Sequence, residues 1–144
     1  MRATEVLAAG RWDGAREVGQ MLADAEQRLR RRLRLQTVAG MPFLLDLPRV
    51  MRLGDGDGLV LEDGGIIRVV AAPEALLEIT AFDDHTLTRV AWHLGQRHVP
   101  VQFLRHRLRV REERLVAELI ERLGCEAAPV SAPFDPEPGA YRHD

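Results

Sequence analysis

The chain has 144 residues, of which 46% are hydrophobic and 29% charged, and its formal net charge is −2. This balance is typical of a globular protein and argues against a general nucleic-acid binder, which carries a basic surplus. No apolar run is long enough to span a bilayer, and the first residues lack the apolar segment and cleavage site of a signal peptide. Cys125 is the only cysteine, so no internal disulfide can form. We therefore expect a cytoplasmic protein that contacts neither membrane nor nucleic acid.

Two glycine-rich turns divide the first half of the chain. The run Asp55-Gly56-Asp57-Gly58 resembles the start of a calcium loop but lacks the remaining ligands, so we interpret it as a turn. Asp63-Gly64-Gly65 joins two short apolar runs, 59–61 and 66–70, which predicts a β-hairpin. A further strand is predicted over 41–47 and is expected to end before Pro48.

The segment from Met21 to Gln36 fits both a helix and a strand. Its first part follows a helical period, but leucine and arginine alternate in the second part, and the flanking turns favour a strand from about Arg28. Five arginines gather here: Arg28, Arg30, Arg31, Arg32 and Arg34. We interpret them as a solvated strand face or edge, with a docking surface for an acidic partner as the alternative. These elements predict a small β-rich domain over residues 1–72.

The pattern changes after Ala71-Ala72-Pro73, which is the predicted domain boundary. A strand is expected over 76–80, and Asp83 then occupies the N-cap position of a helix. Gly95 is predicted to end that helix. The apolar face of the helix has the spacing i, i+3, i+4, i+7 and consists of Leu87, Val90, Ala91 and Leu94.

Three more strands and a second helix complete the chain. Residues 99–104, 108–110 and 125–130 are the predicted strands. The second helix ends at Gly124, and its apolar face consists of Val116, Leu119, Ile120 and Leu123. The order β-α-β-β-α-β is that of a ferredoxin-like domain, expected over residues 73–134. Prolines and a glycine beyond it predict a short flexible tail, residues 135–144, so that the fold class is α+β.

Several segments resemble the urease accessory nickel chaperones, the UreE family. Trp92 to Pro100, which reads WHLGQRHVP, is similar to the Gly-Asn-Arg-His signature of that family. Pro133 to Tyr141 is similar to its closing segment, and the spacing between the two segments also matches. Segments 2–7, 43–48 and 72–79 resemble family members as well. The resemblance therefore covers nearly the whole chain, and the order and spacing of the segments carry it.

The resemblance implies a homodimer that hands nickel to apo-urease with the help of an accessory GTPase and is not an enzyme. Residues 1–72 would be a peptide-binding-like domain, and residues 73–134 would bind the metal. His98 matches the histidine that binds nickel at the dimer interface of the family. There are departures, because Gln96 replaces the usual asparagine and the histidine-rich tail of many relatives is reduced to Arg142-His143-Asp144.

Imidazole is a good ligand for nickel, but one histidine per chain cannot hold a divalent metal tightly. A two-fold axis places the same residue twice at one point, so we expect two copies of His98 to face each other. His143 on the tail is the candidate that completes the shell, and a mobile ligand suits a protein that releases its metal. Zinc or copper is expected to bind in vitro as well.

Other interpretations of these residues stay open at this stage. His98 follows a helix end, where a histidine can also interact with helix carbonyls. His85 and His106 are interpreted as solvated, His93 as a partly buried helix residue, and Cys125 as a small buried hydrophobic residue. The alternative function is a peptide-binding module with a ferredoxin-like dimerisation domain, in which the histidines are incidental.

Overall fold

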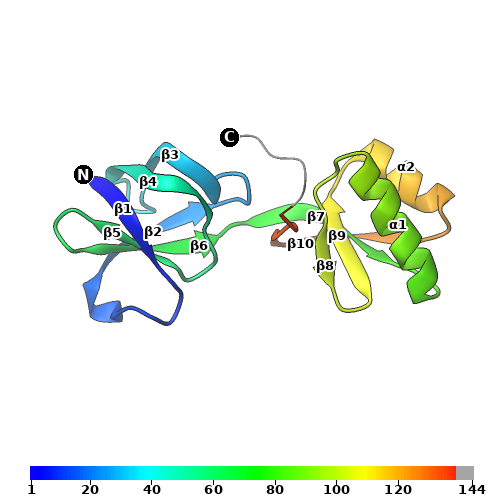
Figure 1. Cartoon of the computed structure of the whole chain (residues 1–144), viewed down its shortest axis with the longest axis horizontal. Helices are drawn as coiled ribbons and strands as arrows, with labels where there is room; N and C mark the ends of the chain where they lie inside the picture. Colours follow the sequence, from blue (N-terminus) through cyan, green and yellow to red (C-terminus); the bar gives the residue numbers. More distant parts are fainter. Residues whose placement is uncertain (139–144) are drawn as a thin grey trace. The chain divides into compact units, whose positions relative to one another are not determined.

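A computed structural model describes residues 1–138 of the chain (Figure 1). The chain divides into two compact units, unit 1 over residues 1–72 and unit 2 from Pro73 onward. Each unit has its own sheet and its own cluster of buried hydrophobic residues. In the described part, no helix has the length and apolar character needed to cross a lipid bilayer.

Unit 1 is built from a six-stranded sheet in the order β2-β6-β5-β1-β4-β3. Most neighbouring strands are antiparallel, but β1 pairs with β4, and β2 with β6, in parallel. The predicted hairpin is confirmed, because β5 and β6 pair antiparallel across Asp63-Gly64-Gly65. The elements are β1 (Arg2–Leu7), the 3-10 helix η1 (Gly14–Arg16), β2 (Glu17–Ala23), β3 (Leu29–Gln36), β4 (Pro42–Arg52), β5 (Gly58–Leu61) and β6 (Ile66–Ala71).

The core of unit 1 follows from alternation along its strands. Met21, Leu45, Leu59 and Ile67 are fully buried and belong to one cluster. Each such side chain contributes about 1.5–3 kcal/mol by leaving water. The aspartates of the predicted turn hold its backbone, since Asp57 accepts hydrogen bonds from the N–H groups of Ala9 and Gly54 at 2.9 and 2.8 Å. The interpretation of residues 55–58 as a turn is thus confirmed.

Strand β4 does not end before Pro48, as the sequence pattern predicts, but continues to Arg52. The reason lies in its pairing with β3. The register shifts between Arg30, which pairs with Met51, and Arg32, which pairs with Asp46. Pro48 therefore falls in an irregular part of the ladder, where the missing N–H donor of a proline costs no strand hydrogen bond.

Arg28 does not belong to the exposed arginine cluster in which the sequence pattern places it. Its side chain is fully buried. Its Nε donates to the carbonyl of Ala23 at 3.3 Å, and one guanidinium NH donates to the carbonyl of Leu53 at 3.3 Å. A buried guanidinium requires such partners, because an unpaired one would lose its hydration without compensation. Arg28 is thus a structural residue of unit 1.

Unit 2 has the predicted order β-α-β-β-α-β, and its four strands form one sheet in the order β10-β7-β9-β8. All the neighbouring pairs in this sheet are antiparallel. The elements are β7 (Pro73–Thr80), α1 (Asp84–Gln96), β8 (Gln102–Leu104), β9 (Arg107–Arg111), α2 (Arg114–Arg122) and β10 (Glu126–Pro133). The mixed α+β class is confirmed.

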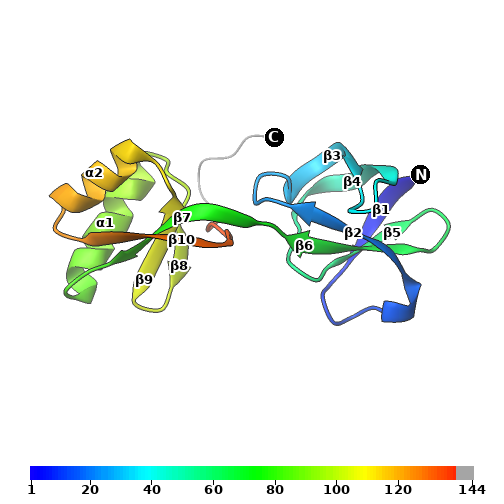
Figure 2. The ribbon, with the colours of Figure 1, turned by 180° about the vertical axis from the view of Figure 1, so that it is seen from behind.

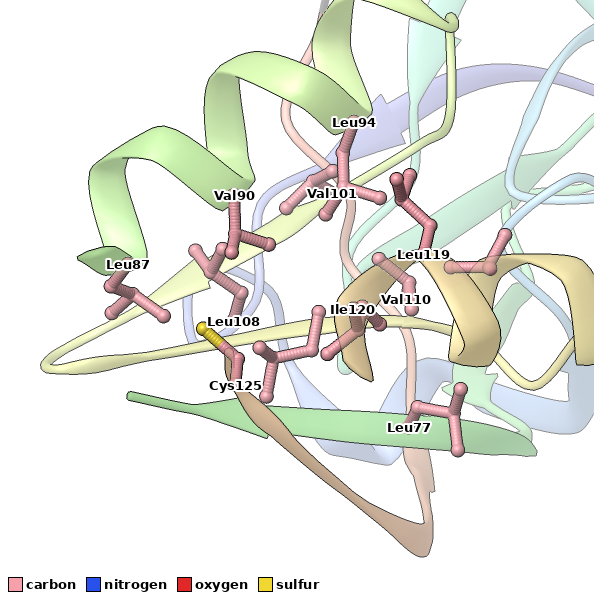
Figure 3. Packing of buried hydrophobic residues seen from close by; sticks show 12 residues of the cluster. Leu77, Leu87, Val90, Leu94, Val101, Leu108, Val110, Leu119, Ile120 and Cys125 are labelled. Atoms are coloured by element: carbon pink, nitrogen blue, oxygen red, sulfur yellow. The ribbon is translucent and has the colours of Figure 1, made fainter. Parts of the chain in front are cut away.

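Both helices cover the same face of this sheet (Figures 1 and 2). Leu77 pairs with Val110 and Ile79 with Leu108, so these four side chains share one face of β7 and β9. Figure 3 shows how the apolar sides of the two helices pack onto that face. The helix residues in this cluster are the predicted ones, Leu87, Val90 and Leu94 from α1 and Val116, Leu119 and Ile120 from α2.

Several boundaries in unit 2 differ from the prediction, since β7 already begins at Pro73 and β10 continues to Pro133. Strand β8 begins at Gln102 and not at Val99, because the N–H of Val99 is bonded to the carbonyl of Leu94 at the end of α1. The first residues of the predicted tail, 135–144, contact the rest of unit 2. The N–H of Glu137 still donates to the carbonyl of Val101 at 2.7 Å, and Phe134 just before the tail is fully buried. Residues 139–144 lie outside the described part of the chain.

Candidate metal site

Helix α1 positions the first candidate ligand, and Asp83 starts this helix. The carboxylate of Asp83 accepts a hydrogen bond from the N–H of Thr86 at 2.8 Å, which confirms the predicted N-cap. Hydrogen bonds from the side chain and backbone of Thr86 lower the pKa of Asp83. Leu87, Val90 and Leu94 bury the inner side of the helix and hold it on the sheet.

The C-terminal end of α1 is a Schellman motif. The N–H of Val99 donates to the carbonyl of Leu94 at 3.0 Å, and the N–H of His98 donates to the carbonyl of Gly95 at 3.1 Å. Val99 packs against the same hydrophobic cluster as Leu94, which is the apolar contact that accompanies this motif. The helix ends at Gln96 with Arg97 as its C-cap, so the prediction that Gly95 ends it is wrong.

His98 occupies the position of the motif that has a left-handed backbone, with φ = 58°. Helix α2 ends in the same way, but there Gly124 holds the equivalent position, with φ = 83°. This conformation costs a residue with a Cβ atom about 1–2 kcal/mol. Such a residue persists where the surrounding structure forces it, and it often marks a functional site. His98 is thus a ligand candidate on a fixed backbone.

The side chain of His98 is exposed and lies at the rim of an open depression of about 640 Å³. One wall comes from the segment after α1, and the other comes from the end of β9 and from α2. The charged groups around it are Arg97, Arg111 and Arg122 with Glu113 and Glu118. An exposed imidazole at such a rim is open to a metal ion and to a second protein surface.

His143, the second candidate ligand, lies outside the described residues, so its place relative to His98 is not defined. Within residues 1–138 there is no group of three or more histidine, cysteine, aspartate or glutamate side chains arranged to hold a metal ion. Among the described residues, His98 is therefore the predicted ligand whose position can be stated.

The other histidines lie where the sequence suggests. His85 is exposed in the first turn of α1. His93 is half-buried on the same helix, with its ring edge-on to Trp92 at a centroid distance of 5.0 Å. Cys125 is buried just before β10, and burial raises the pKa of its thiol. A protonated, buried thiol is a poor metal ligand, which agrees with its structural interpretation.

One contact was missed from sequence. His106 lies in the two-residue turn between β8 and β9 with φ = 62°, and its Nδ1 is 3.2 Å from Oδ1 of Asp84. The two residues are 22 positions apart and no periodic pattern connects them. The sequence gives only a weak indication of this contact. Asp84 is an acidic residue in the first turn of α1, and such a residue attracts a positively charged group that folding brings close.

The comparisons with known proteins identify one class, the accessory proteins of urease. Residues 6–72 match the model of the N-terminal domain of the UreE urease accessory protein, and residues 74–144 match that of its C-terminal domain. The members of this class are chaperones and not enzymes.

The chain belongs to the UreE family. It is 48% identical to the urease accessory protein UreE of Bradyrhizobium sp. (strain ORS 278), over 98% of this chain and 67% of that protein. The corresponding protein of Beijerinckia indica is 43% identical over 98% of this chain and 81% of its own length. That of Chelativorans sp. is 39% identical, over 99% and 87%. Membership implies a role in the maturation of urease.

Proposed function

We propose that the protein is a nickel chaperone that binds Ni²⁺ through His98 at a homodimer interface and delivers it to apo-urease. Nickel is cargo here, and an accessory GTPase is the partner expected to assist the transfer. The observation that carries the proposal is the backbone of His98, which keeps a histidine where the equivalent position of α2 has glycine. A side chain retained at a conformational cost of about 1–2 kcal/mol needs another benefit, and metal binding supplies one.

The surroundings of His98 support the dimeric part of the proposal. His98 and Leu115, both exposed, line the same depression, and Leu115 is 62% exposed. An exposed apolar residue in the same depression as a polar ligand suits an isologous interface, in which each copy presents the same patch to the other. Two imidazoles then meet at the two-fold axis, and His143 of the tail completes the shell. Copper and zinc compete for such ligands in vitro.

The proposal also assigns a separate role to each unit. Unit 2, with its β-α-β-β-α-β order and the sheet order β10-β7-β9-β8, would be a ferredoxin-like domain for metal binding and dimerisation over residues 73–134. Unit 1 would be the peptide-binding-like domain, residues 1–72. Residues 135–144 would serve as the tail that brings His143 to the metal and withdraws it, and the protein would work in the cytoplasm.

Calorimetric titration with nickel tests the proposal. Wild-type protein should bind one tight Ni²⁺ per dimer, and His98→Ala should lower the affinity by roughly 100-fold or more, because the ligand pair is lost. His85→Ala is the matched control, since it removes another exposed imidazole, in the first turn of the helix that His98 follows, and should leave binding unchanged. His143→Ala should weaken binding less and leave the dimer intact. Tight binding by the His98→Ala protein would refute the proposal and favour incidental histidines.

A further inference from the structure

Strand β3 carries four exposed arginines, Arg30, Arg31, Arg32 and Arg34, and is a terminal strand of the sheet in unit 1 (Figures 1 and 2). Among the described strands, its one partner is β4. A terminal strand presents backbone N–H and C=O groups that another chain can bind. Charged side chains often protect such an edge from aggregation. The position and the partners of each arginine therefore have to show whether the cluster protects the edge or binds another chain.

The register of β3 with β4 shows which side chains of β3 lie on each face of the sheet. Leu33 and Leu35 pair with Leu45 and Phe43, which are buried, so these leucines point toward the core of unit 1. Arg32 and Arg34 alternate with them and therefore lie on the outer face. Two residues along a strand are about 7 Å apart, so the two arginines are neighbours on this face of β3.

This pair of positive charges is not balanced by the described part of the protein. Asp46 pairs with Arg32 in the strand register, but its carboxylate is bonded to Arg2 at 3.0 Å. Arg30 has Glu26 at 3.7 Å. Within residues 1–138, Arg32 and Arg34 make no ion pair and no side-chain hydrogen bond. Like charges on one face repel, so an anionic group bound between them would be stabilised.

A depression of about 480 Å³, with both polar and apolar residues in its lining, includes Arg34. Its lining comes from both terminal strands of the sheet, β2 and β3, and from the residues next to them: Leu22, Gln27, Arg34, Leu35, Gln36 and Pro42. Leu22 is 55% exposed although it is a large apolar residue. A partner that contacts this depression would bury Leu22, and the burial of an apolar side chain adds to affinity.

We propose that the outer face of β3 binds an extended acidic segment of a partner protein. Carboxylates of that segment would bind Arg32 and Arg34, and a neighbouring apolar side chain would fill the depression beside Leu22. Arginine suits this role because its planar guanidinium donates two parallel N–H hydrogen bonds to one carboxylate. A nucleic acid is the less favoured partner, since the chain carries a formal net charge of −2 and the exposed Leu22 lines the depression together with Arg34. The proposal rests on the peptide-binding role proposed for unit 1 and is independent of nickel binding by His98.

The test uses a fluorescein-labelled synthetic peptide in which glutamate and valine alternate, with fluorescence anisotropy as the readout. The full-length protein should bind this peptide, and binding should weaken as salt is added. The double variant Arg32→Glu/Arg34→Glu should lower the affinity at least about tenfold, because each charge-assisted contact is worth roughly that factor. Leu22→Ser should also lower it, although it changes no charge. These residues are exposed, so the variants should stay folded, and circular dichroism checks this.

The double variant Arg11→Glu/Arg105→Glu is the control, because it changes the net charge by the same amount at exposed arginines outside β3. It should keep nearly the full affinity for the peptide. The proposal is overturned if the wild-type protein does not bind the peptide or if both double variants lose the same affinity. It is also overturned if a labelled single-stranded oligonucleotide binds the arginine face more tightly than the peptide does.

Discussion

Two roles are considered for the side chain of His98, and they predict different effects of its substitution on stability. In a metal-binding role, the imidazole is kept in spite of the left-handed conformation, which favours glycine. In a purely structural role, the imidazole would stabilise the end of α1 by interacting with helix carbonyls. Both roles place the histidine after the last turn of the helix, so the position alone does not distinguish them. Their effects on stability have opposite signs.

We expect His98→Gly to raise the free energy of unfolding by about 1 kcal/mol, because glycine adopts φ near 58° without a clash of its own. The same variant should lose tight nickel binding. Urea unfolding of the metal-free protein gives the first quantity, and titration with nickel gives the second.

His98→Ala is the control for this experiment. Alanine keeps the Cβ atom and the backbone strain but removes the imidazole, so it should not bring the gain in stability that glycine brings. A loss of stability in both variants would instead assign a structural role to the imidazole and would contradict the proposed one.

At the scale of secondary-structure elements, α1 and α2 end in the same motif but place their glycines differently. Gly124 has φ = 83° and holds the left-handed position after α2. Gly95 lies inside the last turn of α1 and has no positive φ. A sequence rule that places glycine at the left-handed position after a helix is therefore right for α2, but in α1 the glycine lies three residues before that position, which is His98. The hydrogen bond and apolar contact of Val99 set the end of α1, and both form only after folding.

Gly95→Ala should stabilise the protein by about 0.5–1 kcal/mol, since an added Cβ there meets no atom within 4 Å and glycine is a poor helix former. Nickel affinity should not change. Gly124→Ala is the opposite case, because space is equally available but the left-handed backbone makes alanine unfavourable, and stability should fall by about 1 kcal/mol. Thermal unfolding of both variants measures the two effects. A stabilised Gly124→Ala protein would contradict the assignment of its helix cap.

Local signals in the sequence predicted most elements correctly. The hairpin between β5 and β6, both helix faces and the N-cap at Asp83 depend on spacing and turn chemistry within a few residues. The errors concern features that depend on distant partners. Pro48 stays within β4 because the ladder with β3 is irregular there, and Arg28 is buried because the carbonyls of Ala23 and Leu53 surround it.

The candidate site was predictable in part, and for a different reason. His98 was found through a family signature and not through its spacing from other ligands. Its left-handed backbone was not predicted, since local rules assigned the end of the helix to Gly95. The remaining ligands are proposed to come from a second chain and from His143. Neither lies at a helical or strand-like spacing from His98, so no periodic pattern in one chain connects them.

At the scale of the whole molecule, each unit buries its own hydrophobic cluster, and the two clusters share no residue. Ile67 is fully buried in unit 1 and Ile79 in unit 2. Removing one methylene from either should cost about 0.5–1.5 kcal/mol. Because the proposed nickel site lies wholly in unit 2, bound nickel should stabilise that unit and leave unit 1 unaffected.

Differential scanning calorimetry of Ile67→Val and Ile79→Val, each with and without nickel, tests this independence. Ile67→Val should lower the unfolding temperature of one transition, and Ile79→Val that of the other. Nickel should raise the unfolding temperature of the transition that Ile79→Val lowers, because a ligand that binds the folded state shifts the equilibrium of the unit that holds it. A single transition that both variants and nickel shift together would mean that the two units unfold cooperatively. Nickel would then stabilise the β-rich unit through its neighbour.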